Sequence, residues 1–123
     1  SPFLPASDIA NFQVQTSISL NKAQSRNTIE KLHNNFLSTY LRGLRTKEKN
    51  QILLSLPLFR VRSALDVMAT KLATLSFPHS DRENNYINEL TTHLYLEAQK
   101  DLRRWIRGTT TTSFHLPKLK HKN

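Results

Sequence analysis

The sequence contains no cysteine, and this absence excludes disulfide bonds, thiolate metal sites and cysteine nucleophiles. It suits a reducing compartment, because small secreted domains often depend on disulfides for their stability. Apolar runs are short, far below the roughly 20 residues that a membrane-spanning helix needs, and no signal-peptide pattern is present. We therefore expect an intracellular chain without membrane insertion, and we favour the nucleus over the mitochondrion or the cytosol.

Glycine is also scarce, with two residues, Gly43 and Gly108. Neither belongs to a GxGxxG or GxxxxGK motif, so nucleotide-binding loops of those kinds are excluded. The five histidines show no HExxH or other paired-ligand spacing, and the nine acidic residues are dispersed. We therefore expect no catalytic site, no metal site and no cofactor.

The charges that are present are strongly unbalanced. Lys and Arg number 18 against 9 Asp and Glu, which gives a formal net charge of +9. Such an excess attracts polyanions, so nucleic acid, nucleoprotein, anionic membrane surfaces and acidic protein patches are all eligible partners. At 123 residues the chain has the size of one domain. Because it begins with Ser1, we expect either a processed chain or a fragment of a longer protein.

The hydrophobic pattern predicts an all-α fold, a bundle of three long helices and one short helix over residues 25–108. Apolar residues at three- and four-residue steps indicate a helix from Ser25 to Gly43. Thr46 begins a short helix that we expect Pro57 to end, and Pro57 in turn opens a third helix. A capping box at residues 80–83 begins the last helix, which Gly108 ends.

The third predicted helix carries a stripe of apolar residues close to a heptad repeat. Its members lie at steps of three and four: Leu58, Val61, Leu65, Met68, Leu72 and Leu75. A coiled coil is one interpretation, and a buried central helix of the bundle is the one that we prefer. We expect one common core for Leu65, Met68, Leu72, Leu90, Leu94, Leu102 and Trp105.

Both ends of the chain are predicted to be extended. Residues 1–24 form an N-terminal arm, because Val14, Ile18 and Leu20 follow a period of two. Residues 109–123 form a basic tail that is ordered only where it contacts the bundle or another chain. Phe114 in this tail docks onto its own domain, onto a partner, or nowhere.

Basic residues supply the candidate binding site. They fall into three clusters: Arg42, Arg45, Lys47 and Lys49; Arg60 and Arg62; and Lys100, Arg103, Arg104 and Arg107. The last cluster also suits the dipole at the end of its helix without any ligand. Arg60 and Arg62 lie at a predicted helix start, where positive charge is unfavourable unless an anion such as a phosphate neutralises it.

Two functions remain open. The first is a non-catalytic module of a nucleic-acid-associated assembly, which contacts phosphate backbones through these clusters. The second is a protein–protein interaction module, an adaptor or scaffold within a larger complex, without direct nucleic-acid contact. Convergence of the basic clusters on one surface would favour the first function, and their dispersion would favour the second.

Overall fold

A computed structural model describes residues 3–121, and this part of the chain is helical with an extended C-terminal tail. The helices are α1 (Phe3–Ser19), α2 (Arg26–Leu41), α3 (Thr46–Ala73) and α4 (Asp81–Arg107), with a short 3₁₀ helix η1 (Thr74–Ser76) after α3. The predicted all-α bundle is confirmed. The boundaries differ from the predicted ones at two places, α1 and Pro57.

The first difference is α1, which occupies the segment that was expected to be an extended arm. One side of α1 belongs to the core, because its buried residues recur at helical spacing: Ala6, Ile9 and Ala10, Val14, and Ser17. The expectation of an extended arm is wrong for the described residues, and the helical domain includes α1. Positions 14 and 18 lie four apart, which suits a helix as well as a strand, so the short pattern could not separate the two.

The second difference is that α3 continues through Pro57 instead of ending there. Proline removes one backbone donor and disturbs the preceding turn, at a cost of about 3 kcal/mol. Buried residues on both sides of Pro57, from Ile52 and Leu56 to Ala64 and Val67, hold the helix together across it. Tertiary packing therefore overrides the local signal.

Three of the predicted helix ends are confirmed by their caps, whereas Thr46 is the first residue of α3 and does not cap it. Ser25 accepts a hydrogen bond from the Thr28 N–H at 3.2 Å, and Ser80 accepts one from the Glu83 N–H at 3.2 Å. Gly108 ends α4 with a φ of 70°, in the left-handed region that favours glycine.

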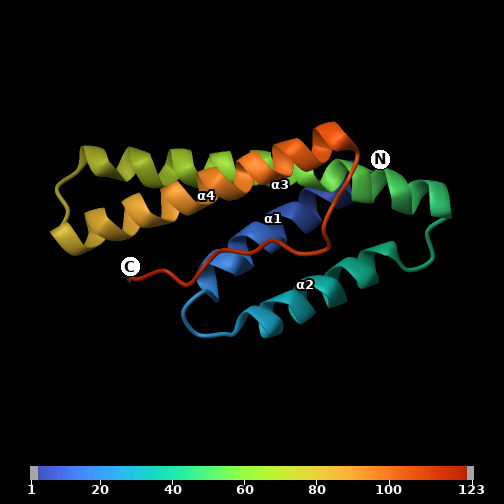
Figure 1. Ribbon diagram of the computed structural model, residues 1–123, viewed down its shortest axis with the longest axis horizontal. Helices are drawn as coiled ribbons and strands as arrows, with labels where there is room; N and C mark the ends of the chain where they lie inside the picture. The colour runs from blue at the N-terminus through green and yellow to red at the C-terminus, as the bar shows by residue number, and fades with distance from the viewer. Residues whose placement is uncertain (1–2, 122–123) are drawn as a thin grey trace.

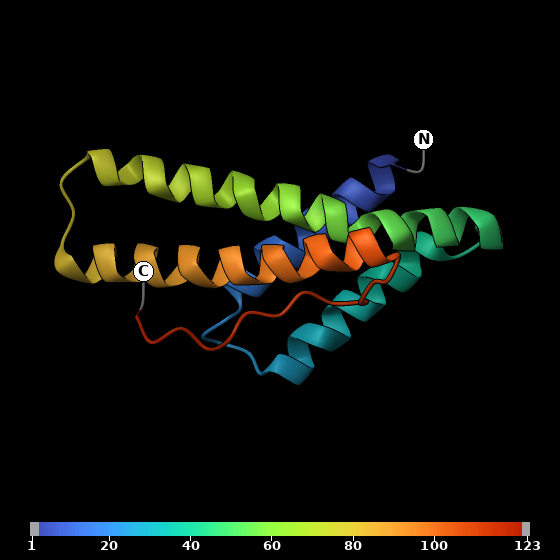
Figure 2. The ribbon, with the colours of Figure 1, turned by 45° about the horizontal axis from the view of Figure 1, so that its top comes forward.

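The long helices α3 and α4 form an antiparallel hairpin, with α1 crossing it and α2 lying on the far side of α1 (Figures 1 and 2). One core cluster joins α1, α2 and the first half of α3 and includes Ile9, Leu37 and Leu56. The other joins α1, α3, α4 and the tail, with Leu90 and Leu94 at its centre.

The predicted core is only partly correct. Leu90 and Leu94 are fully buried, and Met68 packs against the same cluster. Four other members are wrong, because the exposed fraction is 50% for Leu65, 45% for Leu72, 42% for Leu102 and 44% for Trp105. For the two α3 residues the reason is that α3 turns its buried side, from Ile52 to Val67, toward α1 and α4. For the two α4 residues it is that the last buried positions of α4 are Ala98 and Asp101. Four of the six residues of the heptad stripe, Leu58, Leu65, Leu72 and Leu75, are therefore left at the surface.

Candidate nucleic-acid interface

The C-terminal tail forms one wall of the candidate site. Residues 109–121 are extended and run back along α1 and beneath α4 (Figures 1 and 2). Phe114 and Leu119 are buried in the second core cluster. Of the three alternatives for Phe114, the structure shows docking onto its own domain.

Polar side chains of α1 and the turn after it hold the backbone of this tail. Gln13 Nε2 donates to the Thr112 carbonyl at 2.9 Å, and Ser17 Oγ donates to the Phe114 carbonyl at 2.7 Å. Asn21 Nδ2 donates to the Pro117 carbonyl at 2.9 Å, while Asn21 Oδ1 accepts from the Leu119 N–H at 2.9 Å. Gln13, Ser17 and Asn21 are four residues apart, so they form a single row along one side of the segment.

Arg60 is fully buried and therefore cannot be the surface phosphate contact predicted from the sequence. Its guanidinium forms a bidentate pair with Asp101, with both N···O distances at 3.0 Å. It also donates to Gln13 Oε1 at 3.0 Å and to the Thr111 carbonyl at 2.9 Å. The anion that pairs with Arg60 is thus Asp101. Because α3 continues through Pro57, Arg60 lies inside a helix and not at its start.

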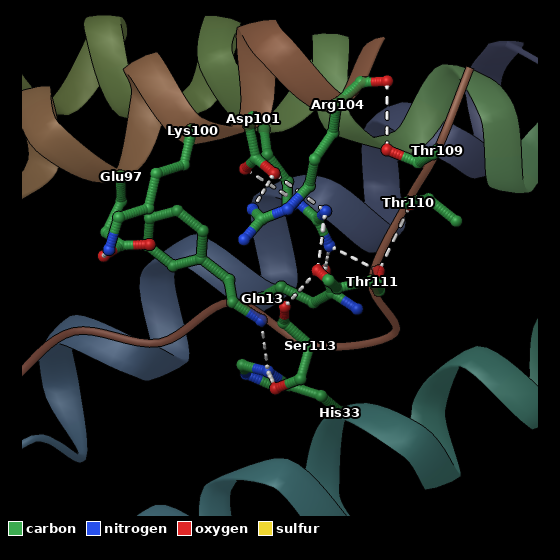
Figure 3. A network of polar contacts seen from close by, with 12 residues as sticks. Gln13, His33, Glu97, Lys100, Asp101, Arg104, Thr109, Thr110, Thr111 and Ser113 are labelled. Carbon is green, nitrogen blue, oxygen red and sulfur yellow. Dashed lines mark hydrogen bonds and ion pairs between the residues drawn. The ribbon is translucent and has the colours of Figure 1, made fainter. Parts of the chain in front are cut away.

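The Arg60–Asp101 pair belongs to a network that links the hairpin to the tail. Figure 3 labels Asp101, Arg104 and Thr111 in this network. Arg104 donates to Asp101 Oδ1 at 2.7 Å, and the side chain of Arg104 remains 30% exposed. Burial lowers the pKa of Arg60, whereas the charge of Asp101 and its hydrogen bonds act in the opposite direction. Arg60 and Arg104 therefore share the buried carboxylate of Asp101. The three groups together carry one net positive charge, and Arg104 is the partly exposed member.

A second buried group, His33 of α2, contacts the tail from the other side. Its Nδ1 lies 2.7 Å from Ser113 Oγ and accepts from the Phe114 N–H at 3.3 Å, and its Nε2 lies 2.8 Å from Thr16 Oγ1. Thr16 Oγ1 donates to the Phe12 carbonyl, so it accepts from His33 Nε2–H, which gives a neutral ring. Burial, followed by the charges of His115 and Arg60, lowers the pKa of His33 to about 4.

A cleft of about 640 Å³ opens between α4, the tail and the start of α2. Its basic lining residues are Arg26, His93, Lys100, Arg103, Arg104, His115 and Lys118. One acidic residue, Glu97, lines the cleft, and its side chain is paired with Lys100 at 2.9 Å. The cleft is therefore positively charged overall.

Lys118 has a structural role in the wall of this cleft. Its ammonium donates to the carbonyls of Asn21 and Gln24, in the turn that follows α1. Lys22 in return donates to the carbonyl of Leu119. Lys118 and Lys22 therefore tie the tail to the turn between α1 and α2.

The structure brings one predicted cluster to the cleft and leaves the others elsewhere. Lys100, Arg103 and Arg104 line it, whereas Arg107 lies at the last turn of α4 and is exposed. Arg62 is exposed on α3. The cluster of Arg42, Arg45, Lys47 and Lys49 lies around the connection between α2 and α3, where all but the half-buried Lys49 are exposed.

Sequence reasoning missed the contributions of Arg26, His93, His115 and Lys118 to this cleft. Arg26 directly follows the Ser25 cap, and the tail was recognised as basic, but these residues are distant from α4 in the sequence. Their convergence depends on the path of the tail, for which the sequence offers no local signal.

Within residues 3–121, no group of three or more His, Asp or Glu side chains is placed to hold a metal ion. The described helices also include none that is both long and apolar enough to cross a bilayer. No protein-family model matches the chain, and neither a curated protein nor a solved structure shows significant similarity to it.

Proposed function

We propose that this chain is a non-catalytic helical module of a nucleic-acid-associated assembly and that it binds phosphate backbone in the basic cleft. The observation that supports this proposal is the gathering of Arg26, Lys100, Arg103 and Arg104 around one cleft, from segments far apart in the sequence. The nucleus is the location that we propose for this function.

The local charges favour an anion even after their internal pairs are subtracted. Glu97 is neutralised by Lys100, and Asp101 is neutralised by the buried Arg60. Arg26, Arg103 and the exposed part of Arg104 then remain to attract an anion. Arginine presents several donors in a planar fork that matches phosphate oxygens, so this set suits a phosphate backbone.

A binding titration at several salt concentrations tests the proposal, with labelled single-stranded and duplex oligonucleotides as probes. Arg103→Glu in the cleft should weaken binding across sequences and reduce the salt slope by roughly one unit per lost phosphate contact. Arg45→Glu makes the same charge change at the α2–α3 connection and is the matched control. An equal loss in both variants would mean attraction by net charge without a site in the cleft.

The adaptor function is the alternative, and two observations favour it. The three basic clusters of the sequence do not converge on one surface, because only Lys100, Arg103 and Arg104 of their members line the cleft. Several large apolar side chains of α3 and α4 are exposed on a side of the hairpin other than the cleft. If the wild-type chain shows no salt-sensitive binding to either oligonucleotide, the adaptor function replaces the nucleic-acid function.

A further inference from the structure

The basic cleft between α4, the tail and the start of α2 differs in chemistry from one end to the other. Six of its α4 residues follow one side of the helix at steps of three and one: His93, Leu96, Glu97, Lys100, Arg103 and Arg104. The cationic side chains of Lys and Arg occupy the last part of this row, whereas His93 and Leu96 occupy the first.

The tail adds apolar side chains to the first part of this row. It runs back antiparallel to α4 (Figures 1 and 2), from the buried ion pair of the network to the point where the His121 N–H donates to Glu89 at 3.0 Å. Leu116 and Pro117 of the middle of the tail also line the cleft, so they lie beside the first part of the row. We call the part of the cleft lined by Leu96, Leu116 and Pro117 the apolar end.

The apolar end offers accessible surface. Leu96 is 45% exposed, and Pro117 is exposed as well. The nearby ammonium of Lys118 donates to the carbonyls of Asn21 and Gln24, so its charge is satisfied by the turn after α1. Accessible apolar surface therefore lies next to the arginines within one cleft.

His115 contributes an aromatic ring to the same cleft. It lines the cleft, and its Nε2 lies 3.7 Å from Glu30. Burial, followed by the charge of Arg26, lowers the pKa of His115, so the ring is neutral at neutral pH. A neutral imidazole presents a flat face on which a nucleic-acid base can stack.

A nucleotide of a single strand matches this division of the cleft, because it joins an anionic phosphate to a base with a weakly polar face. Unpaired bases turn outward and stack on side chains, whereas the bases of a duplex are paired and stacked inside it. The cleft has a volume of about 640 Å³, which lies in the range that encloses a small ligand. It therefore admits a projecting base, which an intact duplex does not offer.

A smaller hollow of about 290 Å³ adjoins the cleft, and four lining residues are common to both: Arg26, Glu97, Arg104 and His115. The rest of its lining comes from Glu30 and the tail residues 111–114. The hollow therefore extends the cleft along the tail and provides room for more than one nucleotide. Its two carboxylates balance its two arginines, so the excess of positive charge belongs to the larger cleft.

We propose that the cleft selects single-stranded nucleic acid, taking one base at the apolar end while Arg103 and Arg104 bind the adjoining phosphate. This inference rests on the proposed function, and it adds the class of strand and the contact to the base. Binding should remain tolerant of sequence, because every base has a face that can stack.

Fluorescence anisotropy on the full chain tests the inference with two probes of equal length and charge, a single-stranded oligonucleotide and an abasic strand. The wild type should bind the oligonucleotide roughly five- to tenfold more tightly, at the lower end of what one stacked base contributes. Leu96→Ala should remove most of this preference and leave the affinity for the abasic strand unchanged. Leu72→Ala is the matched control and should keep the preference, because Leu72 is also 45% exposed but does not line the cleft.

Unlabelled competitors complete the test. A duplex at equal phosphate concentration should displace the oligonucleotide less well than the unlabelled single strand does, and a mononucleotide should displace it only weakly. Equal displacement by either competitor overturns the inference, as does an equal change in the two leucine variants. Equal, salt-sensitive binding of the two labelled strands overturns the base contact alone, whereas an absence of salt-sensitive binding to both overturns the proposed function as well.

Discussion

Arg60 and Arg103 both belong to basic clusters of the sequence, yet they occupy opposite environments. The guanidinium of Arg60 is buried, pairs with Asp101, and donates hydrogen bonds to Gln13 and Thr111. Arg103 is exposed and lines an open cleft. An arginine covered by the tail therefore stabilises the fold, whereas an arginine at the surface of the cleft is accessible to a ligand.

The largest effect is expected from breaking the buried pair. Arg60→Ala should lower the free energy of unfolding by about 3–5 kcal/mol, because it leaves Asp101 buried with Arg104 as its remaining cation. Chemical denaturation measures the change. A loss below 1 kcal/mol would contradict the buried position of this pair.

The hydrophobic core provides the next contrast, between two leucines of the hairpin. Leu94→Ala should cost about 2–5 kcal/mol, because Leu94 is fully buried in the second core cluster. Leu72→Ala should cost much less, since Leu72 is 45% exposed. Equal losses in the two variants would show that α3 has a different orientation.

The pH dependence of the free energy of unfolding tests the burial of His33 against the tail. The pKa of His33 falls from 6.5 to about 4 on folding, so between these values the unfolded chain binds a proton that the folded chain does not. Stability should therefore decrease as the pH falls through this window, by up to ~1.4 kcal/mol per pH unit. The lowered pKa of His115 acts in the same direction.

Thermal unfolding between pH 7 and pH 4 measures this dependence, and His33→Gln is the variant to compare. The wild type should lose stability more steeply than the variant over this range. Parallel curves would show that His33 is not the group responsible.

A smaller effect is expected from the row of polar side chains that holds the tail. Asn21→Ala removes the contacts to Pro117 and Leu119 and leaves the buried Leu119 N–H without a partner, at a cost of about 1–3 kcal/mol. Hydrogen exchange should accelerate at the Leu119 amide and leave the centre of α4 unchanged. Unchanged exchange at Leu119 would mean that Asn21 does not anchor the tail.

The smallest effect on the free energy of unfolding is expected from replacing Arg103, in contrast to Arg60. Arg103→Ala should change the free energy of unfolding by no more than about 0.5 kcal/mol, because its side chain is at the surface. Denaturation curves of this variant and of Arg60→Ala should differ by several kcal/mol. A large loss in Arg103→Ala would place this residue in the structural network.

Much of the fold could be predicted because its signals are local. The caps at Ser25, Ser80 and Gly108 determine where helices begin and end through the backbone groups that they satisfy. The site was harder to predict. The basic cluster of α4 was recognised in the sequence. Its position beside Arg26 and the tail could not be predicted, because these segments are distant in the sequence and meet only in the folded chain.

Composition and neighbours within a few positions determine the helical class, several of the helix ends and the excess of positive charge, so these features could be read from the sequence. The tertiary structure decided which charges became structural. Arg60 and Asp101 are 41 positions apart, and Gln13 meets Thr112 across 99 positions. Burial of a charge depends on which distant segments cover it, and the tail residue Thr111 that contacts Arg60 is 51 positions away in the sequence.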